Sequence, residues 1–278
     1  MNRLERSTGQ ALAKGRRQLV AYIVAGDPSP EWTVEAMHAM VDAGVDIIEL
    51  GVPFTDPEAE GPVIQLGHER ALAHGVTLRR TLGLVEAFRT TNQSTPIVLM
   101  GYLNPIEAMG FDTFGRAAQA AGVDGTIIVN LPPEEAVELA PVLLEHEICP
   151  VFLLAPTTTD ARAKKVCDAS RGFVYYVSLK GTTGSAKLDP NDVAQRVTHF
   201  KSMTDQAVYV GFGIKDAASA ELVGRVSDGV VIGSSLVDDM GKLGCALELD
   251  AGGRASALLP ITERLSAIRT ALDQIQPD

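Results

Sequence analysis

Glu49 is an acidic residue within an otherwise apolar run at 47–51, where it stands between Ile48 and Leu50. A carboxylate in such a run costs free energy unless it is paired or used chemically. Apolar surroundings would also raise its pKa toward neutrality, which suits a general acid. A salt-bridged structural glutamate is the alternative. We interpret Glu49 as a candidate catalytic acid at the end of a strand.

A stiff acidic loop follows, with the sequence VPFTDPEAEGP at 52–62. Prolines limit the conformations of the loop and help to hold a side chain in place. Glu60, or less favourably Glu58, could form an acid/base pair with Glu49 on opposite sides of a substrate. The alternative is a solvated acidic loop, which is common on protein surfaces.

Three glycine-containing turns follow late apolar runs, at 178–184, 210–214 and 232–235. Glycine permits close backbone approach to phosphate oxygens, and a helix that begins in such a turn supplies free N–H groups. Plain turns are the alternative for any one of them. The residues that we expect to bind a phosphorylated substrate here are Thr183, Gly184, Gly211, Phe212, Gly213, Gly233 and Ser234.

Apolar and aromatic residues at the ends of other runs would line a hydrophobic pocket, although some must belong to the core. The candidates are Tyr22, Met100, Tyr102, Ile127 and Tyr175. The polar tips of Tyr102 and Tyr175 fit a half-open pocket better than a closed core.

The composition excludes several classes of protein. A net charge of −11 and a pI near 4.9 argue against nucleic-acid binding and against long-range steering of an anionic substrate. Any phosphate site must therefore be local. The histidines at 38, 68, 74, 146 and 199 show no metal-ligand spacing and should lie away from strand ends, so we expect no metal.

The chain has three cysteines and no C-x-x-C motif, which is typical of reduced thiols in the cytoplasm. It begins without the apolar stretch of a signal peptide and contains no run long enough to span a membrane. We therefore expect a cytoplasmic protein.

Short apolar runs alternate with helical patterns along the whole chain. The predicted strands are 19–25, 46–51, 96–100, 125–129, 149–154, 173–178, 207–212 and 229–233. The predicted helices are 31–43, 78–91, 111–121, 133–146, 160–169, 189–203, 216–225 and 255–274, with a short helix opening at Ser234. Eight such units favour a closed (β/α)8 TIM barrel over an open flavodoxin-like sheet.

Two segments lie outside this repeat. Residues 1–15 contain an amphipathic pattern at 2–14, which predicts an extra N-terminal helix over the bottom of the barrel. Residues 241–254 are predicted to form a glycine-rich loop before the last helix. No linker separates any part of the chain, so residues 1–278 are expected to form a single domain.

The motifs together resemble the tryptophan synthase α subunit family over about residues 17–240. The run ELGVPFTDPEAEGP at 49–62 carries most of the resemblance. The motifs AGDP at 25–28, GTTG at 181–184, GFG at 211–213 and GS at 233–234 add to it, in family order and spacing. The resemblance implies a lyase of tryptophan biosynthesis that cleaves indole-3-glycerol phosphate, by a retro-aldol reaction, to indole and glyceraldehyde 3-phosphate.

In the family, the residue at the position of Glu49 protonates the indole ring at C3 and assists the glycerol hydroxyl. A carboxylate at the position of Glu60 contacts the indole N–H. Many members carry Asp at this second position and Asp where this chain has Asn130, and a Val where it has Thr182. We hypothesise that the 181–187 loop closes over substrate when Thr183 reaches toward the active site.

The resemblance also implies an α2β2 heterotetramer in which a β subunit takes up the indole. Pyridoxal phosphate would be held by that subunit, and this chain would need no cofactor. The positions that match the contact surface are Asp56, Pro57 and Pro132. Two alternatives remain: a weakly active or non-catalytic activator of the β subunit, and an aldolase that forms a Schiff base through Lys180.

Overall fold

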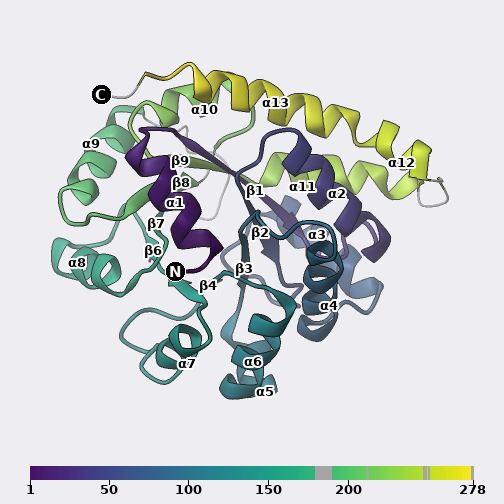
Figure 1. The fold of residues 1–278 in the computed structure, drawn as a ribbon, viewed down its shortest axis with the longest axis horizontal. Helices are drawn as coiled ribbons and strands as arrows, with labels where there is room; N and C mark the ends of the chain where they lie inside the picture. The colour runs from purple at the N-terminus through teal and green to yellow at the C-terminus, as the bar shows by residue number, and fades with distance from the viewer. Residues whose placement is uncertain (179–189, 212, 247–248, 250, 277–278) are drawn as a thin grey trace.

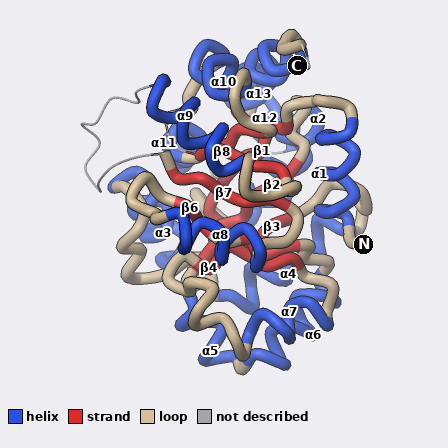
Figure 2. Tube along the Cα trace, turned by 90° about the vertical axis from the view of Figure 1, so that its left-hand side faces the viewer, coloured by secondary structure: helices blue, strands red, loops and turns tan. Residues whose placement is uncertain are grey.

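Parallel strands form a nearly closed barrel in the part of the chain that the computed structural model describes, residues 1–178, 190–211, 213–246, 249 and 251–276. Figure 2 shows the strands in the centre and the helices around them. The strands are β1 (Gln18–Val24), β2 (Ile47–Gly51), β3 (Ile97–Gly101), β4 (Gly125–Ile128), β5 (Cys149–Val151), β6 (Leu153–Leu154), β7 (Phe173–Val177), β8 (Ala207–Gly211) and β9 (Gly229–Ile232).

The two ends of the sheet come from one stretch of chain. The strand order is β5-β4-β3-β2-β1-β9-β8-β7-β6, so β5 and β6 stand at opposite ends although only Phe152 separates them. The Phe152 N–H donates to the Ser170 hydroxyl, at 3.2 Å, instead of to a neighbouring strand. The single strand predicted at 149–154 is therefore interrupted at Phe152 and forms β5 and β6. The nearly closed barrel of parallel strands confirms the prediction of a (β/α)8 barrel.

Helices cover the outside of the barrel (Figure 1). They are α1 (Arg3–Ala13), α2 (Pro30–Asp42), α3 (Pro62–Ala73), α4 (Leu78–Arg89), α5 (Leu103–Met109), α6 (Phe111–Ala121), α7 (Leu139–Glu145), α8 (Asp160–Ala169), α9 (Pro190–Lys201), α10 (Ala217–Gly224), α11 (Ser234–Lys242), the 3-10 helix η1 (Leu243–Ala246), α12 (Ala251–Ala257) and α13 (Leu259–Asp273).

Helix α1 lies across the end of the barrel where the strands begin (Figure 1). Asn2 caps it: its side chain accepts the Glu5 N–H, while the Glu5 carboxylate accepts the Asn2 N–H. Leu4 is fully buried and joins the cluster of side chains inside the barrel. The N-terminal helix therefore closes this end with apolar side chains.

Three carboxylates repeat one contact at this same end. Asp46, Asp124 and Asp228 each stand directly before a strand, and each accepts the backbone N–H of a residue on the preceding strand, at 2.8 to 2.9 Å. Each also pairs with at least one basic side chain, as Asp124 does with Arg89 at 2.7 Å and Arg3 at 2.9 Å. These paired carboxylates join neighbouring strands to the surrounding helices.

Two helices were not predicted from the sequence. Helix α3 buries Gly67, His68 and Ala71, so it lacks the stripe of large apolar side chains that marks a helix. Gly67 is needed there, because a Cβ atom would lie 2.8 Å from Val237 of α11. Helix α5 has seven residues and buries only Ile106, too little for a recognisable period.

Two further segments differ from the prediction. The 241–254 segment is not simply a loop, since α11 extends into it to Lys242 and η1 and the start of α12 lie within it. Arg254 on α12 pairs with Glu35 of α2 at 2.6 Å, which gives a tertiary reason for helix there. Only the second half of the helix predicted at 133–146 forms, as α7, and turns precede it.

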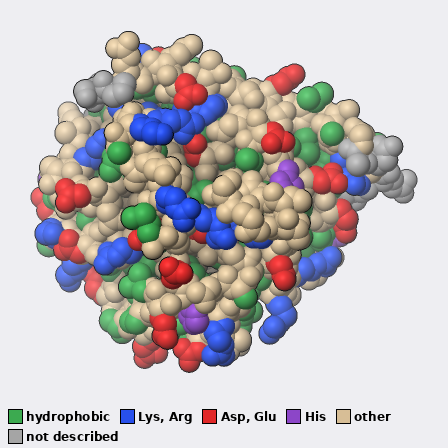
Figure 3. Space-filling model, in the orientation of Figure 1, with side chains coloured by type: hydrophobic (Ala, Val, Ile, Leu, Met, Phe, Trp, Pro, Cys, Tyr) green, Lys and Arg blue, Asp and Glu red, His purple; other side chains and the backbone are tan. Residues whose placement is uncertain are grey.

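The outer surface mixes both signs of charge. On the face shown in Figure 3, Lys and Arg side chains are interspersed with Asp and Glu. Among the described residues, no helix is long and apolar enough to cross a membrane.

Candidate active site

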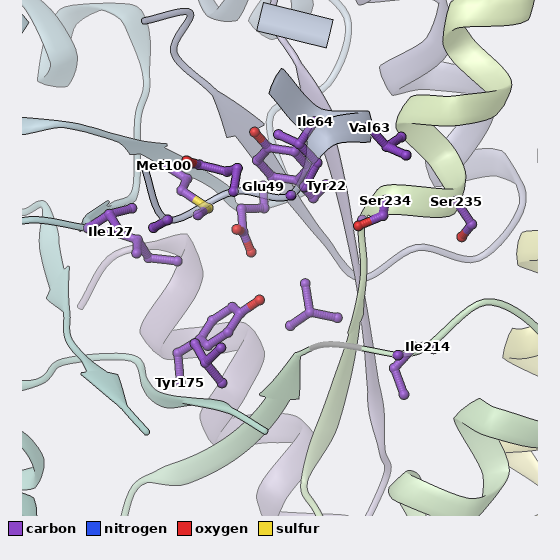
Figure 4. A pocket seen from close by; sticks show the side chains of 18 of the residues that line it. Tyr22, Glu49, Val63, Ile64, Met100, Ile127, Tyr175, Ile214, Ser234 and Ser235 are labelled. Atoms are coloured by element: carbon purple, nitrogen blue, oxygen red, sulfur yellow. The ribbon is translucent and has the colours of Figure 1, made fainter. Parts of the chain in front are cut away.

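A pocket of about 630 Å³ opens at the end of the barrel where the strands finish. This is the end at which barrel enzymes carry their active sites. In Figure 4, Met100 and Ile127 lie on the left of the pocket, Glu49 and Tyr22 above its centre, Tyr175 below, and Ser234 on the right, across from Met100 and Ile127. Of the predicted site residues, Tyr22, Glu49, Glu60, Met100, Ile127, Tyr175, Gly213, Gly233 and Ser234 line this pocket.

Strand alternation turns Glu49 toward the barrel interior. Ile48 and Leu50 pack in the layer between strands and helices, whereas Ile47 belongs to the cluster inside the barrel. Glu49 is 1% exposed, and its Oε2 has no hydrogen-bond partner within the described residues. Burial, with a smaller contribution from the charge of Glu60, raises the pKa of Glu49 to about 8. Glu49 is therefore protonated at neutral pH.

Glu60 is held by a phenol. Its Oε2 accepts a hydrogen bond from the Tyr102 hydroxyl, which in turn accepts the Ala59 N–H at 3.0 Å. Burial raises the pKa of Glu60, and the bond from Tyr102 opposes that rise. The longer side chain of Glu60, compared with an aspartate, thus has a fixed partner in the barrel wall. Glu58 is exposed and does not line the pocket, so the loop offers one carboxylate to the site.

The opposite side of the pocket is built for an anion. Helix α11 begins at Ser234 with Gly233 as its N-cap residue, so its first N–H groups are free to bind a ligand. Ser235 also lines the pocket, and its buried Oγ has no hydrogen-bond partner within the described residues. Lys215 is the only Lys or Arg among the described residues that line the pocket.

Two predicted residues lie behind the pocket wall instead of in it. Tyr102 contacts Glu60 and stacks on Phe54, with ring centroids 4.9 Å apart, and is not a lining residue. Gly211 also does not line the pocket. A Cβ atom at Gly211 would lie 2.1 Å from the Tyr175 hydroxyl, so this glycine leaves space for that ring. Sequence position alone does not distinguish a lining residue from one that supports it.

Several predicted residues lie outside the described part of the chain. These are Thr183, Gly184 and Phe212, together with Lys180 and the rest of the 181–187 loop.

Sequence reasoning missed His68, Lys215 and Ser235. The prediction that every histidine lies away from the strand ends is wrong for His68, which is buried on α3 beside Tyr22 and the 52–61 loop. Because helix α3 was not predicted, the sequence did not indicate which way the side chain of His68 points. Lys215 directly follows the predicted glycine turn at 210–214, and Ser235 is the last residue of the turn predicted at 232–235, so these turns were the available signal.

The positions expected to meet a partner surround the same end of the barrel. Asp56 is exposed on the 52–61 loop, Pro57 is buried in it, and Pro132 is partly exposed after β4. Asn130 does not enter the pocket; its side-chain oxygen accepts the Leu103 N–H at 2.8 Å and so fixes the start of α5.

Comparisons with known proteins agree with this arrangement. A family model described as "Tryptophan synthase alpha chain" matches residues 9–255. The tryptophan synthase alpha chain of Marinobacter nauticus is 53% identical over 275 residues, covering 99% of each chain. A crystal structure of the α subunit from Legionella pneumophila aligns with a TM-score of 0.88 at 40% identity, covering 99% of this chain and 100% of that one. A structure from the tryptophan synthase α2β2 complex of Pyrococcus furiosus aligns with a TM-score of 0.80 at 38% identity, covering 92% and 98%. The chain belongs to the tryptophan synthase alpha chain family.

Proposed function

We propose that this protein is a lyase that catalyses the α reaction of tryptophan biosynthesis, the retro-aldol cleavage of indole-3-glycerol phosphate to indole and glyceraldehyde 3-phosphate. The observation that carries the proposal is a buried carboxyl, Glu49, with a pKa of about 8 and an unpartnered oxygen, in the wall of an apolar pocket. Family membership names the substrate, and the pocket offers a group for each of its parts.

Glu49 acts as the general acid. Its neutral carboxyl donates a proton to C3 of the indole ring, which gives an indolenine cation and makes the ring an electron sink. The ionised Glu49 then takes the proton of the adjacent glycerol hydroxyl. The bond between C3 and the hydroxyl-bearing carbon breaks, its electron pair returns to the ring, and that carbon becomes the aldehyde. Glu49 thus donates one proton and accepts one proton in each turnover, and it ends in its neutral form.

Glu60 stabilises the cationic ring. Its carboxylate accepts a hydrogen bond from the indole N–H, which becomes more acidic when C3 is protonated. Tyr102 keeps one oxygen of Glu60 bound, so the other oxygen is available to the substrate. Both carboxyl groups line the same pocket, and they divide the acid role and the charge-stabilising role between them.

The two ends of the substrate fix its position. The indole ring lies among the apolar side chains of Met100, Ile127 and Tyr175, and the phosphate binds at Gly213, Gly233 and Ser234. The positive end of the α11 dipole favours a dianion there, although the whole chain carries a net charge of −11. Thr183, Gly184 and Phe212 complete the substrate site in this proposal.

A β subunit is the proposed partner. The 52–61 loop around Asp56 and Pro57, with Pro132, would contact it in an α2β2 heterotetramer, and the β subunit would hold the pyridoxal phosphate. We place the assembly in the cytoplasm, in line with the cysteine content of the chain.

The test is an assay of indole release from indole-3-glycerol phosphate, with and without the β subunit, for wild type, Glu49→Gln and Glu60→Gln. Loss of the proton at Glu49 should lower kcat by roughly 10²- to 10⁴-fold, and Glu60→Gln should also lower it. Glu58→Gln is the matched control in the same loop and should stay near wild type.

Near-normal turnover of Glu49→Gln would contradict the proposed mechanism. A wild-type chain that releases no indole even with the β subunit present would reject the lyase proposal and favour an activator role.

A further inference from the structure

His68 is a buried imidazole that the proposed mechanism does not use. It lies on α3, the helix that directly follows the 52–61 loop, and it is 1% exposed. Each of its ring nitrogens faces a part of the site. Nδ1 lies 3.0 Å from the backbone nitrogen of Phe54, and Nε2 lies 3.5 Å from the hydroxyl of Tyr22.

The Phe54 contact determines the tautomer of this ring. A backbone N–H can only donate, so Nδ1 must accept, and the single proton of the neutral ring lies on Nε2. Burial lowers the pKa of His68 to about 4, which keeps the ring neutral at physiological pH. The Nε2–H group then points at the Tyr22 hydroxyl as a donor. In this state the imidazole joins the loop after β2 to the end of β1.

Phe54, the residue that His68 anchors, is connected to Glu60 through Tyr102. The ring of Phe54 stacks on the ring of Tyr102, with a centroid separation of 4.9 Å and an interplanar angle of 24°. The Tyr102 hydroxyl donates to Glu60 and accepts the Ala59 N–H, at the far end of the same loop. The loop is thus held at its start by His68 and at its end by Tyr102, and Phe54 connects the two contacts.

Tyr22 connects the other nitrogen to the pocket. It pairs with Glu49 in the register of β1 and β2, and it lines the pocket beside that residue. Its hydroxyl lies so close to Gly51 that a Cβ atom there would be 2.4 Å away. The phenol is therefore confined between β2 and the imidazole.

We propose that His68 is a positioning residue for the α reaction: as the Nε2–H tautomer it anchors Phe54 and thereby holds Glu60 in place for the indole N–H. The assignment rests on the proposed function and extends it to a residue that does not itself touch the substrate.

Two conservative variants separate the two nitrogens. His68→Asn can keep an acceptor near the position of Nδ1, whereas His68→Gln extends to the position of Nε2 and loses the Phe54 anchor. We expect kcat of His68→Asn to stay within about threefold of wild type. We expect kcat of His68→Gln to fall by roughly 10- to 100-fold with little change in KM, because small misplacement of a positioned group is costly.

His74→Gln is the matched control, since His74 is exposed at the other end of α3 and should leave kcat unchanged. Equal kcat values for His68→Asn and His68→Gln would overturn the proposal that Nδ1 is the functional nitrogen. Melting temperatures of both variants show whether either effect is a loss of folded protein.

A double-mutant cycle tests the route through Glu60. When Glu60 is replaced by Gln, the further change His68→Gln should lower kcat by less than about twofold, because the group that His68 positions is already lost. A full additional loss in that background would mean that His68 affects kcat by a route other than Glu60, and it would overturn the proposal.

The tautomer can be read without any turnover. In wild-type protein with ¹⁵N-labelled histidine, long-range ¹H–¹⁵N spectra should show one neutral Nε2–H ring at pH 7 that is missing in His68→Gln. An Nδ1–H or doubly protonated ring would overturn the anchor even if the enzyme is active. Conversely, a correct tautomer in a chain that releases no indole would reject the proposed function and leave the anchor as a loop contact without a catalytic role.

Discussion

Environment gives the two carboxyl groups at the end of the barrel different roles. Glu49 is buried without a partner for Oε2 among the described residues, so burial keeps it protonated at neutral pH. Burial raises the pKa of Glu60 as well, but Glu60 receives a hydrogen bond from Tyr102 that opposes this rise and favours the ionised form. The same side chain type can therefore serve as acid in one place and as charge stabiliser in another.

The raised pKa of Glu49 predicts a specific dependence of stability on pH. Between the ordinary glutamate pKa of 4.5 and about 8, the folded state holds a proton that the unfolded state has lost. Wild-type stability should therefore fall as pH rises through this window, by about 1.4 kcal/mol per pH unit at most from this group. Glutamine does not titrate, so the free energy of unfolding of Glu49→Gln does not fall for this reason. The stability of the variant relative to wild type should therefore rise from pH 5.5 to 8 and then level off.

Urea unfolding of both proteins at pH 5.5, 6.5, 7.5 and 8.5 measures the difference, and Glu58→Gln serves as the exposed control. A constant difference between Glu49→Gln and wild type over this range would show that Glu49 is ionised throughout.

At the scale of the elements, two strands end in a glycine because a side chain there would overlap an aromatic ring of the pocket. Gly211 at the end of β8 leaves room for the Tyr175 hydroxyl, as Gly51 at the end of β2 does for Tyr22. A side chain at either position would push a ring into the pocket or distort the strand. Glycine in a strand is otherwise unfavourable, so its presence here indicates close approach.

Gly211→Ala should therefore damage both the site and the fold. The new Cβ atom would lie 2.1 Å from the Tyr175 hydroxyl. We expect about 1–3 kcal/mol of destabilisation from overpacking, together with a drop of roughly tenfold or more in kcat/KM because Tyr175 moves.

Gly83→Ala is the control for this substitution. It lies exposed on α4 with no atom within 4 Å of the added Cβ, and it should stabilise the protein by about 0.5–1 kcal/mol without a change in kcat/KM. Denaturant unfolding and the indole assay measure both quantities. Wild-type kinetics and stability in Gly211→Ala would show that β8 and Tyr175 do not meet as described.

The molecule as a whole separates its stabilising contacts from its chemistry. The paired carboxylates Asp46, Asp124 and Asp228 lie where strands begin, together with α1, whereas the pocket opens where strands finish. Residues at one end can therefore change stability without a change in the geometry at the other.

Asp124→Ala tests this separation. The change leaves Arg89 buried without its carboxylate and removes the acceptor for the Ile97 N–H. We expect a loss of about 3–5 kcal/mol in the free energy of unfolding, with kcat and KM of the folded enzyme unchanged. Asp205→Ala, an exposed position at the same end, should change stability by less than about 0.5 kcal/mol. An altered KM in folded Asp124→Ala would show that the two ends are coupled.

Much of the fold was predictable because its signals are local. Continuous apolar runs predicted the strands within one or two residues, and an acidic residue between apolar neighbours, Ile48 and Leu50, predicted the inward carboxyl of Glu49. The clearest error is a missed helix. Helix α3 was missed because its buried residues, Gly67, His68 and Ala71, do not form a stripe of large apolar side chains. Contacts with α11 and with the 52–61 loop explain why Gly67 and His68 stand there.

The sequence by itself determined the order of strands and helices, the positions of the glycine turns and the presence of Glu49 at a strand end, because periodicity and backbone preference act over a few neighbouring residues. Only the tertiary structure decided which groups meet there. Tyr102 binds Glu60 from 42 residues away, and His68 reaches Tyr22 from 46 residues away. Such contacts depend on closure of the barrel, which brings the ends of separate strands together and leaves no local trace in the chain.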